Sequence, residues 1–147
     1  MISFNHKSFA ELSPNEIYQI LRLRSEVFVV EQNCVYLDAD NKDPHCIHLM
    51  GWQNNQLIAY SRIVPPGISY VEPSIGRVVT SPLVRRKGVG RQLMLKSLEV
   101  LYNNFGKTAI KIGAQFYLKQ FYESLGFRQN SEIYDEDGIE HIEMVRK

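Results

Sequence analysis

The sequence predicts a single α/β domain in which a mixed β-sheet is flanked by helices. The chain has 147 residues, which is enough for one ordinary hydrophobic core but too few for two. Strand-like and helix-like segments alternate along it, and no linker, repeat or low-complexity stretch divides them. Near the middle, an apolar strand-like run, a glycine turn and an amphipathic helix follow one another, as in a strand–helix–strand crossover. We therefore expect residues 1–147 to fold as one domain.

The first predicted elements are a strand at Ile2–Lys7 and a helix that begins within Ser13-Pro14-Asn15-Glu16. This tetrapeptide supplies an N-cap serine, a proline at the first helical position and a capping-box glutamate. Apolar residues then recur with the 3.6-residue period as far as Phe28, and Arg24 falls on the same phase, where a lone charge needs a partner. From Val30 to Pro44 we expect a loop.

Two β-hairpins are predicted from paired strand-like runs around two-residue turns. The runs are Leu49–Gln53 with Gln56–Ile63, and Phe127–Tyr134 with Ile139–Val145. Asn54-Asn55 joins the first pair and Asp137-Gly138 the second, because these residues tolerate the positive φ of a tight turn. Pro65-Pro66-Gly67 ends the first hairpin.

The predicted crossover lies between the hairpins. It consists of Ile75–Ser81, the glycine turn, a long helix and Thr108–Ala114. Such a crossover is right-handed and makes its two strands parallel, which places the turn at the carboxyl edge of the sheet. A short helix at Gln115–Leu125 follows, with Gly126 as its C-terminal stop.

Composition excludes several classes of protein. The hydrophobic content of 44%, the charged content of 22% and the net charge of +1 are those of a globular protein without a general affinity for nucleic acid. No run of about eighteen apolar residues occurs, and the N-terminus lacks the apolar core of a signal peptide. We therefore expect a cytoplasmic protein without a membrane partner. Cys34 and Cys46 are too few for a disulfide framework, and nothing local activates Cys34, so we interpret it as a small buried thiol.

The most informative segment is the basic glycine turn from Arg85 to Arg91, which opens the helix after the crossover strand. A helix start has unpaired backbone N–H groups and a partial positive charge, and Gly88 and Gly90 let an anion approach the backbone. The turn therefore predicts a phosphorylated cofactor. It lacks the Gly-Lys-Ser/Thr of a Walker loop and the third glycine of a dinucleotide fingerprint. It also contains no aromatic residue, which argues against nucleic-acid binding.

The segment from Asp38 to His48 suggests a metal site but does not fit one. The glycine and closing glutamate positions of an EF-hand are occupied by Asp43 and Leu49. His45, Cys46 and His48 lie too close together for a usual four-ligand zinc site. We interpret the segment as a structural loop and predict no metal.

Two motifs together resemble the GNAT N-acetyltransferase superfamily. The first is Arg85-x-x-Gly88-x-Gly90 after a strand that ends in Ser-Pro, and the second is Phe121-Tyr122-x-x-x-Gly126-Phe127 about thirty residues later. The order of predicted elements is also that of the GNAT fold, so the resemblance covers nearly the whole chain. The ElaA-type branch is indicated by several further segments. They are Leu23-Arg24, Val27 to Cys34, Asp40, His48, Gly76-Arg77-Val78 and Gly113-Ala114-Gln115.

The resemblance implies an enzyme that moves an acetyl group from acetyl-coenzyme A to a primary amine of a small molecule or protein, by direct attack in a ternary complex. The backbone of Val78 to Thr80 would pair with the pantetheine arm, and the amides of Arg86 to Arg91 would hold the pyrophosphate. Tyr122 would protonate the leaving thiolate, although packing alone also explains a tyrosine at this apolar position. The implied cofactor-binding residues are Val78, Val79, Thr80, Arg85, Arg86, Lys87, Gly88, Val89, Gly90, Arg91, Gln115 and Tyr122. Gln115 stands where many relatives have asparagine.

The sequence indicates the residues that bind the acceptor less clearly than those that bind the cofactor. Candidate acceptor-binding residues are Arg24, Glu31, Arg77 and His48. If both arginines face the cleft, they favour an acceptor with a carboxylate or phosphate beside its amine; alternatively, Arg24 forms an internal ion pair with Glu31 or Asp40. Arg77 stands where some relatives have a glutamate base, and a guanidinium cannot serve as one.

The general base is therefore sought at Glu31, Glu72, His48, His141 or a chain of water molecules. An acyl-coenzyme A binding module without turnover is the alternative function. The sequence leaves open a homodimer formed through the C-terminal hairpin.

Overall fold

The computed structural model describes all residues from Met1 to Lys147, and its strands form two sheets rather than one mixed sheet. The first sheet has the order β1-β2-β3-β4, and all its neighbours are antiparallel. Its strands are β1 Ser3–Ser8, β2 Ile47–Gln53, β3 Gln56–Val64 and β4 Ser74–Thr80. In the second sheet β8 pairs with β5, β6 and β7, again antiparallel. These strands are β5 Ile110–Gln115, β6 Arg128–Gln129, β7 Tyr134–Glu136 and β8 Ile139–Arg146.

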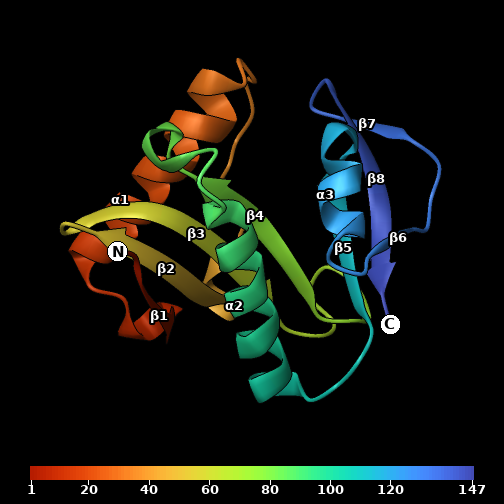
Figure 1. Cartoon of the computed structure of the whole chain (residues 1–147), viewed down its shortest axis with the longest axis horizontal. Coiled ribbons are helices and arrows are strands. Elements are labelled where there is room, and N and C mark those ends of the chain that lie inside the picture. Colours follow the sequence, from red (N-terminus) through yellow and green to blue (C-terminus); the bar gives the residue numbers. More distant parts are fainter.

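The two sheets meet at β4 and β5, where the predicted parallel pairing is not formed. The strands start side by side and run in the same direction, and the Lys111 amide donates to the Pro73 carbonyl at 3.2 Å. Beyond that point they diverge, so no ladder joins them (Figure 1). The α/β fold and the crossover are thus as predicted, but β4 and β5 leave an opening between them instead of closing a single sheet.

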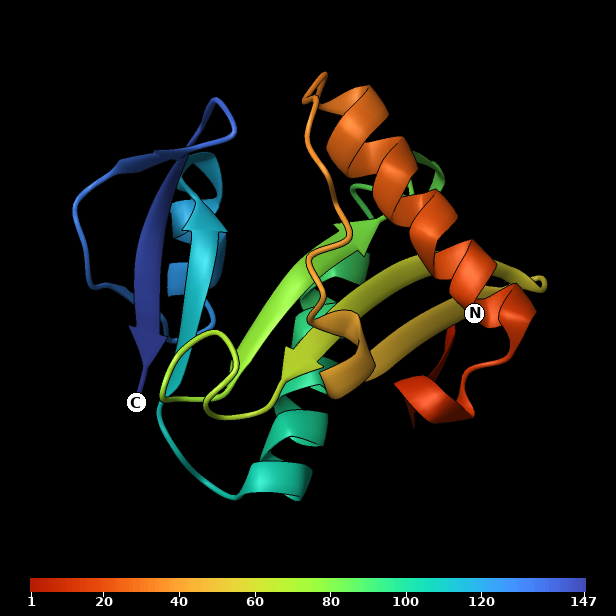
Figure 2. The ribbon, with the colours of Figure 1, turned by 180° about the vertical axis from the view of Figure 1, so that it is seen from behind.

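Helices cover both faces of the first sheet. Helix α2, Val89–Phe105, packs on β3 and β4 from one face, and helix α1, Pro14–Arg24, packs on the same strands from the other (Figures 1 and 2). A π-helical segment, η2 at Ser25–Glu31, extends α1 into the predicted loop. The short α3, Lys119–Glu123, lies beside β5, and four 3-10 turns complete the chain. These turns are η1 Phe9–Glu11, η3 Asp43–His45, η4 Pro82–Val84 and η5 Phe116–Leu118.

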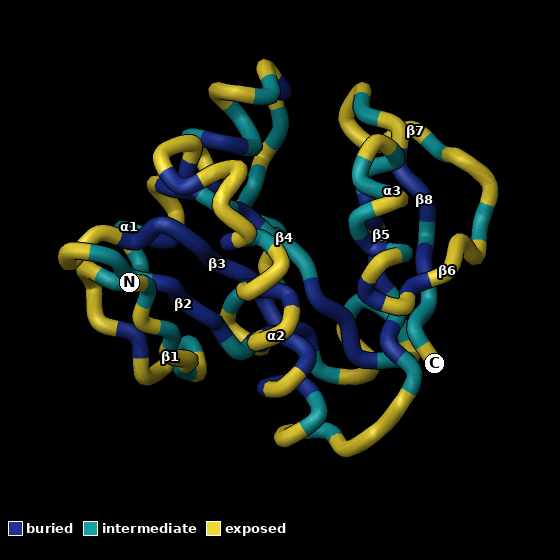
Figure 3. Tube along the Cα trace, viewed as in Figure 1, coloured by how far each residue is buried: buried dark blue, intermediate teal, exposed yellow.

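Two apolar cores hold these layers together. The larger core joins α2 to both sheets through residues such as Leu93, Ile112 and Phe127, and the smaller packs Ile20 and Leu23 of α1 on the opposite face of the first sheet. Figure 3 shows β3 buried along most of its length, whereas the turn before α2 and the tip of the β7–β8 hairpin are exposed. No helix has both the length and the apolar character needed to cross a membrane.

Most predicted turns and caps are present. The Ser13 capping box opens α1, and both hairpin turns have positive φ, at Asn54 and Asn55 (52° and 62°) and at Asp137 and Gly138 (53° and 84°). The predicted strand Phe127–Tyr134 is wrong over most of its length, because only its two ends pair with β8. The predicted helix Gln115–Leu125 is shorter than expected, since η5 precedes α3.

Candidate active site

The opening between β4 and β5 forms a cleft of about 630 Å³. One side, which we call the turn wall, is formed by Val78–Thr80 of β4, Arg85 and Gly90. The other, the hairpin wall, is formed by Gly113 of β5 with Glu136, Asp137 and His141 of the β7–β8 hairpin. Residues of η2, η5 and α3 complete the lining, so four stretches of the chain meet in one cavity, within 27–36, 75–90, 113–122 and 136–141.

A β-bulge shapes the turn wall. Tyr60 of β3 is opposite Val79 and Arg62 is opposite Gly76, so two residues of β4, Arg77 and Val78, face the single residue between them. Arg77 takes a left-handed φ of 50° at this point. A bulge interrupts the ladder and leaves backbone groups without strand partners, and here it does so along the cleft. This bulge was not predicted from the sequence, although a glycine inside a strand, here Gly76, is a known signal for one.

The basic glycine turn adjoins this bulge. Gly88 is the N-cap of α2 with a φ of 76°, and Arg86 also has a positive φ of 64°. The first amides of α2 lack intrahelical acceptors. Gly90 lines the cleft, and a Cβ placed there would have only the Phe121 ring nearby, at 3.9 Å. The turn therefore offers free N–H groups and open space together.

The structure separates the predicted cofactor-binding residues into two groups. Seven line the cleft, namely Val78, Val79, Thr80, Arg85, Gly90, Gln115 and Tyr122. Of the others, Arg86, Lys87, Gly88 and Arg91 are exposed on the turn beside the cleft, and the Val89 side chain is buried in the larger core. Any contact of Val89 with a ligand must therefore be through its backbone.

The segment from Glu31 to Cys34 spans the mouth of the cleft and contacts both walls. The Arg85 guanidinium binds both carboxylate oxygens of Glu31 and donates to the Thr80 carbonyl at 3.3 Å. The side chains of Gln32 and Gln115 are hydrogen-bonded at 3.2 Å, and the Cys34 thiol donates to the Asp137 carbonyl at 3.2 Å. The hydrogen bonds from Arg85 lower the pKa of Glu31, so this carboxylate is charged at neutral pH.

Tyr122 lies between the cleft and the core. It is 6% exposed and packs edge-on against Phe121 and Phe127, with ring centroids 5.1 and 6.0 Å away. Tyr122 lines the cleft, and its hydroxyl forms no hydrogen bond within the chain. Burial raises the pKa of Tyr122 above that of an ordinary phenol, so the hydroxyl keeps its proton at neutral pH.

Arg24 is not in the cleft. It is fully buried, and it donates from Nε to Asp38 at 2.7 Å and from Nη1 to Asp43 at 2.9 Å. The ion pair that the sequence analysis offered as an alternative is therefore formed, but with different partners from the Glu31 or Asp40 that were expected. Asp43 also binds Arg62, which donates to it at 2.9 Å and to Asp40 at 2.7 Å.

Arg77 lines the cleft, but its charge is already matched. It donates to the Asp38 carboxylate at 2.8 Å and lies 3.4 Å from an Asp40 oxygen. The hypothesis of an acceptor with an anionic group depended on both Arg24 and Arg77 facing the cleft. The structure removes its basis, because one arginine is elsewhere and the other is paired.

His48, the remaining predicted acceptor residue, is also outside the cleft. It is buried, its Nδ1 accepts from the Tyr60 hydroxyl at 2.6 Å, and its Nε2 donates to the Asp43 carbonyl at 2.9 Å. Burial lowers the pKa of His48, so its ring is a neutral structural group. The predicted role of His48 as an acceptor contact or base is therefore wrong.

His141 is the imidazole that does line the cleft. It is 8% exposed, its Nδ1 donates to the Ile139 carbonyl at 2.8 Å, and its Nε2 lies 3.3 Å from a Glu136 oxygen. Of the candidate bases, Glu31 is held by Arg85, and Glu72 does not line the cavity. The sequence analysis missed Tyr36, Gly113, Glu136 and Asp137 as lining residues.

Comparisons with known proteins agree with this geometry. The family model described as acetyltransferase (GNAT) domain matches residues 11–147. Protein ElaA of Escherichia coli strain K12 is 42% identical over 149 residues, which span 100% of this chain and 97% of ElaA. The crystal structure of Escherichia coli ElaA has a TM-score of 0.94, with 100% of both chains covered.

Two further solved structures are informative at different levels. An acyl-CoA N-acyltransferase from Pseudomonas aeruginosa is 39% identical with a TM-score of 0.96, again over 100% of both chains. An aminoglycoside 6′-N-acetyltransferase complexed with coenzyme A is 17% identical with a TM-score of 0.70, over 97% of this chain and 96% of that one, which shows a shared fold alone.

The chain belongs to the GNAT acetyltransferase family and is an acyltransferase. Within that family it is ElaA-like over its full length. The sequence resemblance to this branch is confirmed.

Proposed function

We propose that this acyltransferase moves the acetyl group of acetyl-coenzyme A to a primary amine by direct attack in a ternary complex. The observation that carries the proposal is the meeting of three features in one cleft. A bulged strand, a helix N-terminus at a glycine turn and a buried tyrosine with a free hydroxyl all border the same cavity. These are the parts needed to hold a thioester, bind its phosphates and protonate its sulfur.

The residues present fit coenzyme A. Gly90 leaves open space beside the first amides of α2, where a pyrophosphate would bind. Arg85, Arg86, Lys87 and Arg91 add positive charge at that point. Val78 and Thr80 border the apolar part of the cleft with their backbone, as an extended pantetheine arm requires, and Gln115 faces them from β5. When bound, acetyl-coenzyme A would supply an activated acyl group as a thioester.

The chain's own groups would assist the transfer in three ways. The backbone N–H groups freed by the bulge at Arg77 and Val78 would donate to the oxygen on which negative charge develops. The Tyr122 hydroxyl, kept protonated by its burial, would give its proton to the departing sulfur. His141, the one imidazole lining the cleft, would accept the proton that the amine loses.

Calorimetric titration of acetyl-coenzyme A into the purified protein, followed by a free-thiol release assay over a panel of amines, tests the proposal. We expect micromolar binding and amine-dependent release. Binding without release for any amine would favour the alternative, an acyl-coenzyme A binding module without turnover. Absence of binding would reject the placement of the cofactor at the glycine turn.

A further inference from the structure

Arg77 is the one residue of β4 with a left-handed backbone, and it stands at the β-bulge. Residues with a Cβ rarely adopt its φ of 50°, because the Cβ then lies close to the following carbonyl oxygen. The neighbouring Gly76 could take a positive φ without that cost, but it does not have one. A strained residue of this kind persists only where its surroundings hold it in place. The conformation of Arg77 therefore depends on what its side chain binds.

The Arg77 side chain is bound mainly by one residue, Asp38. Its Nε donates to Asp38 Oδ1 at 2.8 Å, and its Nη2 donates to the Asp38 backbone carbonyl at 2.9 Å. The guanidinium also lies 6.0 Å from the centre of the Tyr36 ring, and a longer contact of 3.4 Å reaches Asp40. Because the side chain and the backbone of Asp38 bind two different nitrogens, they fix both the position and the direction of the Arg77 guanidinium.

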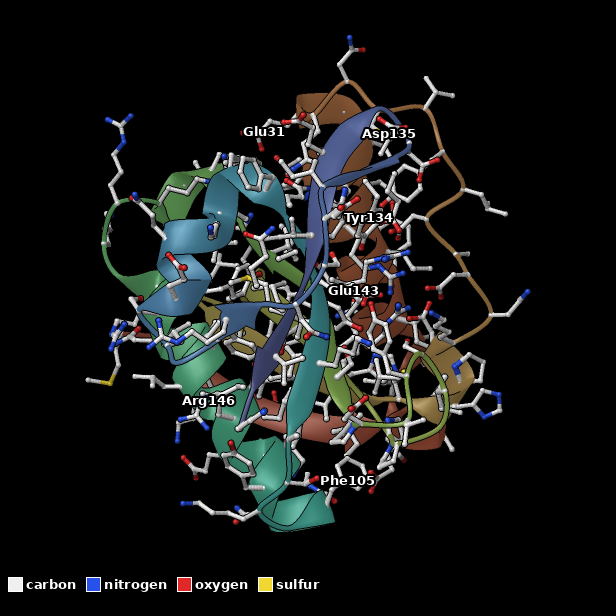
Figure 4. All side chains as sticks on the ribbon, turned by 90° about the vertical axis from the view of Figure 1, so that its right-hand side faces the viewer. Glu31, Phe105, Tyr134, Asp135, Glu143 and Arg146 are labelled. Carbon is white, nitrogen blue, oxygen red and sulfur yellow. The ribbon has the colours of Figure 1, made fainter.

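Asp38 is held in turn by Arg24 at the end of α1. The fully buried Arg24 donates from Nε to Asp38 Oδ2 at 2.7 Å and from Nη2 to the Asp38 carbonyl at 3.3 Å. The other oxygen of Asp38, Oδ1, accepts from Arg77 and from the Tyr36 hydroxyl. Figure 2 shows the loop after η2 crossing β4 before it reaches η3, and Figure 4, which labels Glu31 at the end of η2, shows the same loop from the side. The loop therefore links α1 to the bulge.

The backbone on both sides of Arg77 borders the cleft. Gly76, Arg77 and Val78 all line it, whereas Asp38 does not. Peptide groups are planar, so the N–H of Arg77 and the N–H of Val78 can be turned relative to each other only through the φ and ψ of Arg77. A return of Arg77 to an extended conformation would therefore direct these two N–H groups differently.

From this arrangement we infer that Asp38 is a positioning residue for acyl transfer. By binding the guanidinium, it holds Arg77 in the left-handed conformation and keeps the N–H groups of Arg77 and Val78 directed at the acyl oxygen. This inference rests on the proposed function, in which those N–H groups stabilise the negative charge that develops on that oxygen. Arg24 assists by anchoring Asp38 to α1. Asp38 itself touches neither the cofactor nor the acceptor and acts through Arg77.

A pair of ligands tests the direction of the N–H groups without any acceptor. S-ethyl-coenzyme A has a methylene where acetyl-coenzyme A has its carbonyl, so the ratio of their affinities in calorimetry reports hydrogen bonds to the acyl oxygen. We expect the parent protein to bind the thioester about fivefold more tightly, as one hydrogen bond to a neutral carbonyl provides. The second readout is kcat for thiol release with the best amine of the panel.

Asp38→Asn and Asp43→Asn form a matched pair of variants. The two carboxylates are similarly buried, with side chains 11% and 14% exposed, and both bind Arg24, but Asp43 does not contact Arg77. Both variants should lower the free energy of unfolding in urea. Only Asp38→Asn should bring the affinity ratio close to one and lower kcat by about tenfold or more, with little change in the affinity for S-ethyl-coenzyme A.

A second pair of variants tests the backbone of Arg77 directly. Arg77→Gly and Arg77→Ala both remove the guanidinium and its bonds to Asp38, but only glycine takes a left-handed φ without strain. We therefore expect Arg77→Ala to lose at least fivefold more of kcat than Arg77→Gly does. Adding Arg77→Gly to Asp38→Asn should likewise recover part of the affinity ratio, which a merely structural role of Asp38 would not allow.

The outcomes separate the inference from the proposed function. The inference would be overturned if the parent protein did not prefer the thioester, if Asp43→Asn lost the preference as fully as Asp38→Asn, or if glycine and alanine at position 77 were equally harmful. Each of these results would leave the acetyltransferase proposal standing, provided that an amine releases thiol. Cofactor binding without release from any amine would overturn the proposed function itself, and the inference with it.

Discussion

The turn wall and the hairpin wall of the cleft are built in different ways. The turn wall comes from one continuous segment, since β4, the basic glycine turn and the start of α2 follow one another in the chain. The hairpin wall combines Gly113 of β5 with residues that come more than twenty positions later, and Tyr36 beside it comes from yet another segment. A continuous segment therefore has much of its conformation set by local sequence, whereas an assembled wall depends on how distant elements pack.

The largest expected effect is on the free energy of unfolding, and it tests how far the loop around Arg77 depends on packing between distant elements. Arg24→Met removes the buried guanidinium that joins Asp38 to Asp43, which leaves Asp38 with Arg77 and Asp43 with Arg62. Removing one member of a buried ion pair typically costs about 3–5 kcal/mol. We expect the free energy of unfolding in urea to fall by that amount. Arg22→Met is the control, because Arg22 and its partner Glu26 are largely exposed; a similar loss in both variants would contradict the structural role of Arg24.

The second prediction concerns a substitution that alters the turn wall alone. Gly88→Asp places a carboxylate beside the proposed pyrophosphate site and strains a backbone with φ of 76°. Like charges brought together cost several kcal/mol, so affinity for acetyl-coenzyme A should fall by about a hundredfold or more in calorimetry. Gly106→Asp is a matched control at the opposite end of α2, since Gly106 has the same φ and equally open surroundings. If Gly106→Asp weakens binding as much, backbone strain rather than anion binding explains the loss.

The third prediction asks whether Tyr122 acts in catalysis or only in packing. Its hydroxyl has no partner within the chain, so Tyr122→Phe should preserve both the fold and cofactor affinity. Loss of a general acid typically lowers the rate by about a hundredfold, which single-turnover kinetics would detect. Tyr117→Phe, at an exposed tyrosine that also lines the cleft, should have little effect. An unchanged rate in Tyr122→Phe would leave packing as its role.

The smallest expected effect concerns the contact between the mouth segment and the turn wall. Arg85 binds Glu31 and also donates to the Thr80 carbonyl, the backbone group proposed for the pantetheine arm. Glu31→Gln weakens this attachment and leaves Arg85 more available to a phosphate. Because the pair is partly exposed, we expect acetyl-coenzyme A to bind only about two- to fivefold more tightly. Weaker binding would mean that Glu31 positions Arg85 for the cofactor instead of competing with it; Glu26→Gln is the control for net charge.

Local features of the fold were predictable because their causes lie within a few residues. The Ser13 capping box starts α1, Asn54-Asn55 makes a tight turn, and Gly88 takes a positive φ at the start of α2. Each depends on conformations and hydrogen bonds between near neighbours in the chain. The two GNAT motifs belong to this class, and for that reason the family could be predicted from sequence.

Predictions that required distant partners were less accurate. Arg24 needed a carboxylate, but periodicity alone did not distinguish Asp38 and Asp43 from Glu31 and Asp40. The strand expected at Phe127–Tyr134 has suitable residues, yet only its ends reach β8. His48 and His141 are both histidines near apolar residues, and only packing puts one beneath the loop and the other in the cleft.

The sequence by itself determined the fold class, the family and the glycine turn that opens α2, because periodicity, capping and glycine conformation are local properties of the chain. Tertiary structure alone decided that β4 and β5 diverge, that Arg77 is neutralised, and that an acidic hairpin faces the basic turn across the cleft. These features arise from contacts between residues far apart in the chain, whose free energy depends on burial and charge pairing after folding. No sequence pattern within a few neighbouring residues predicts these contacts.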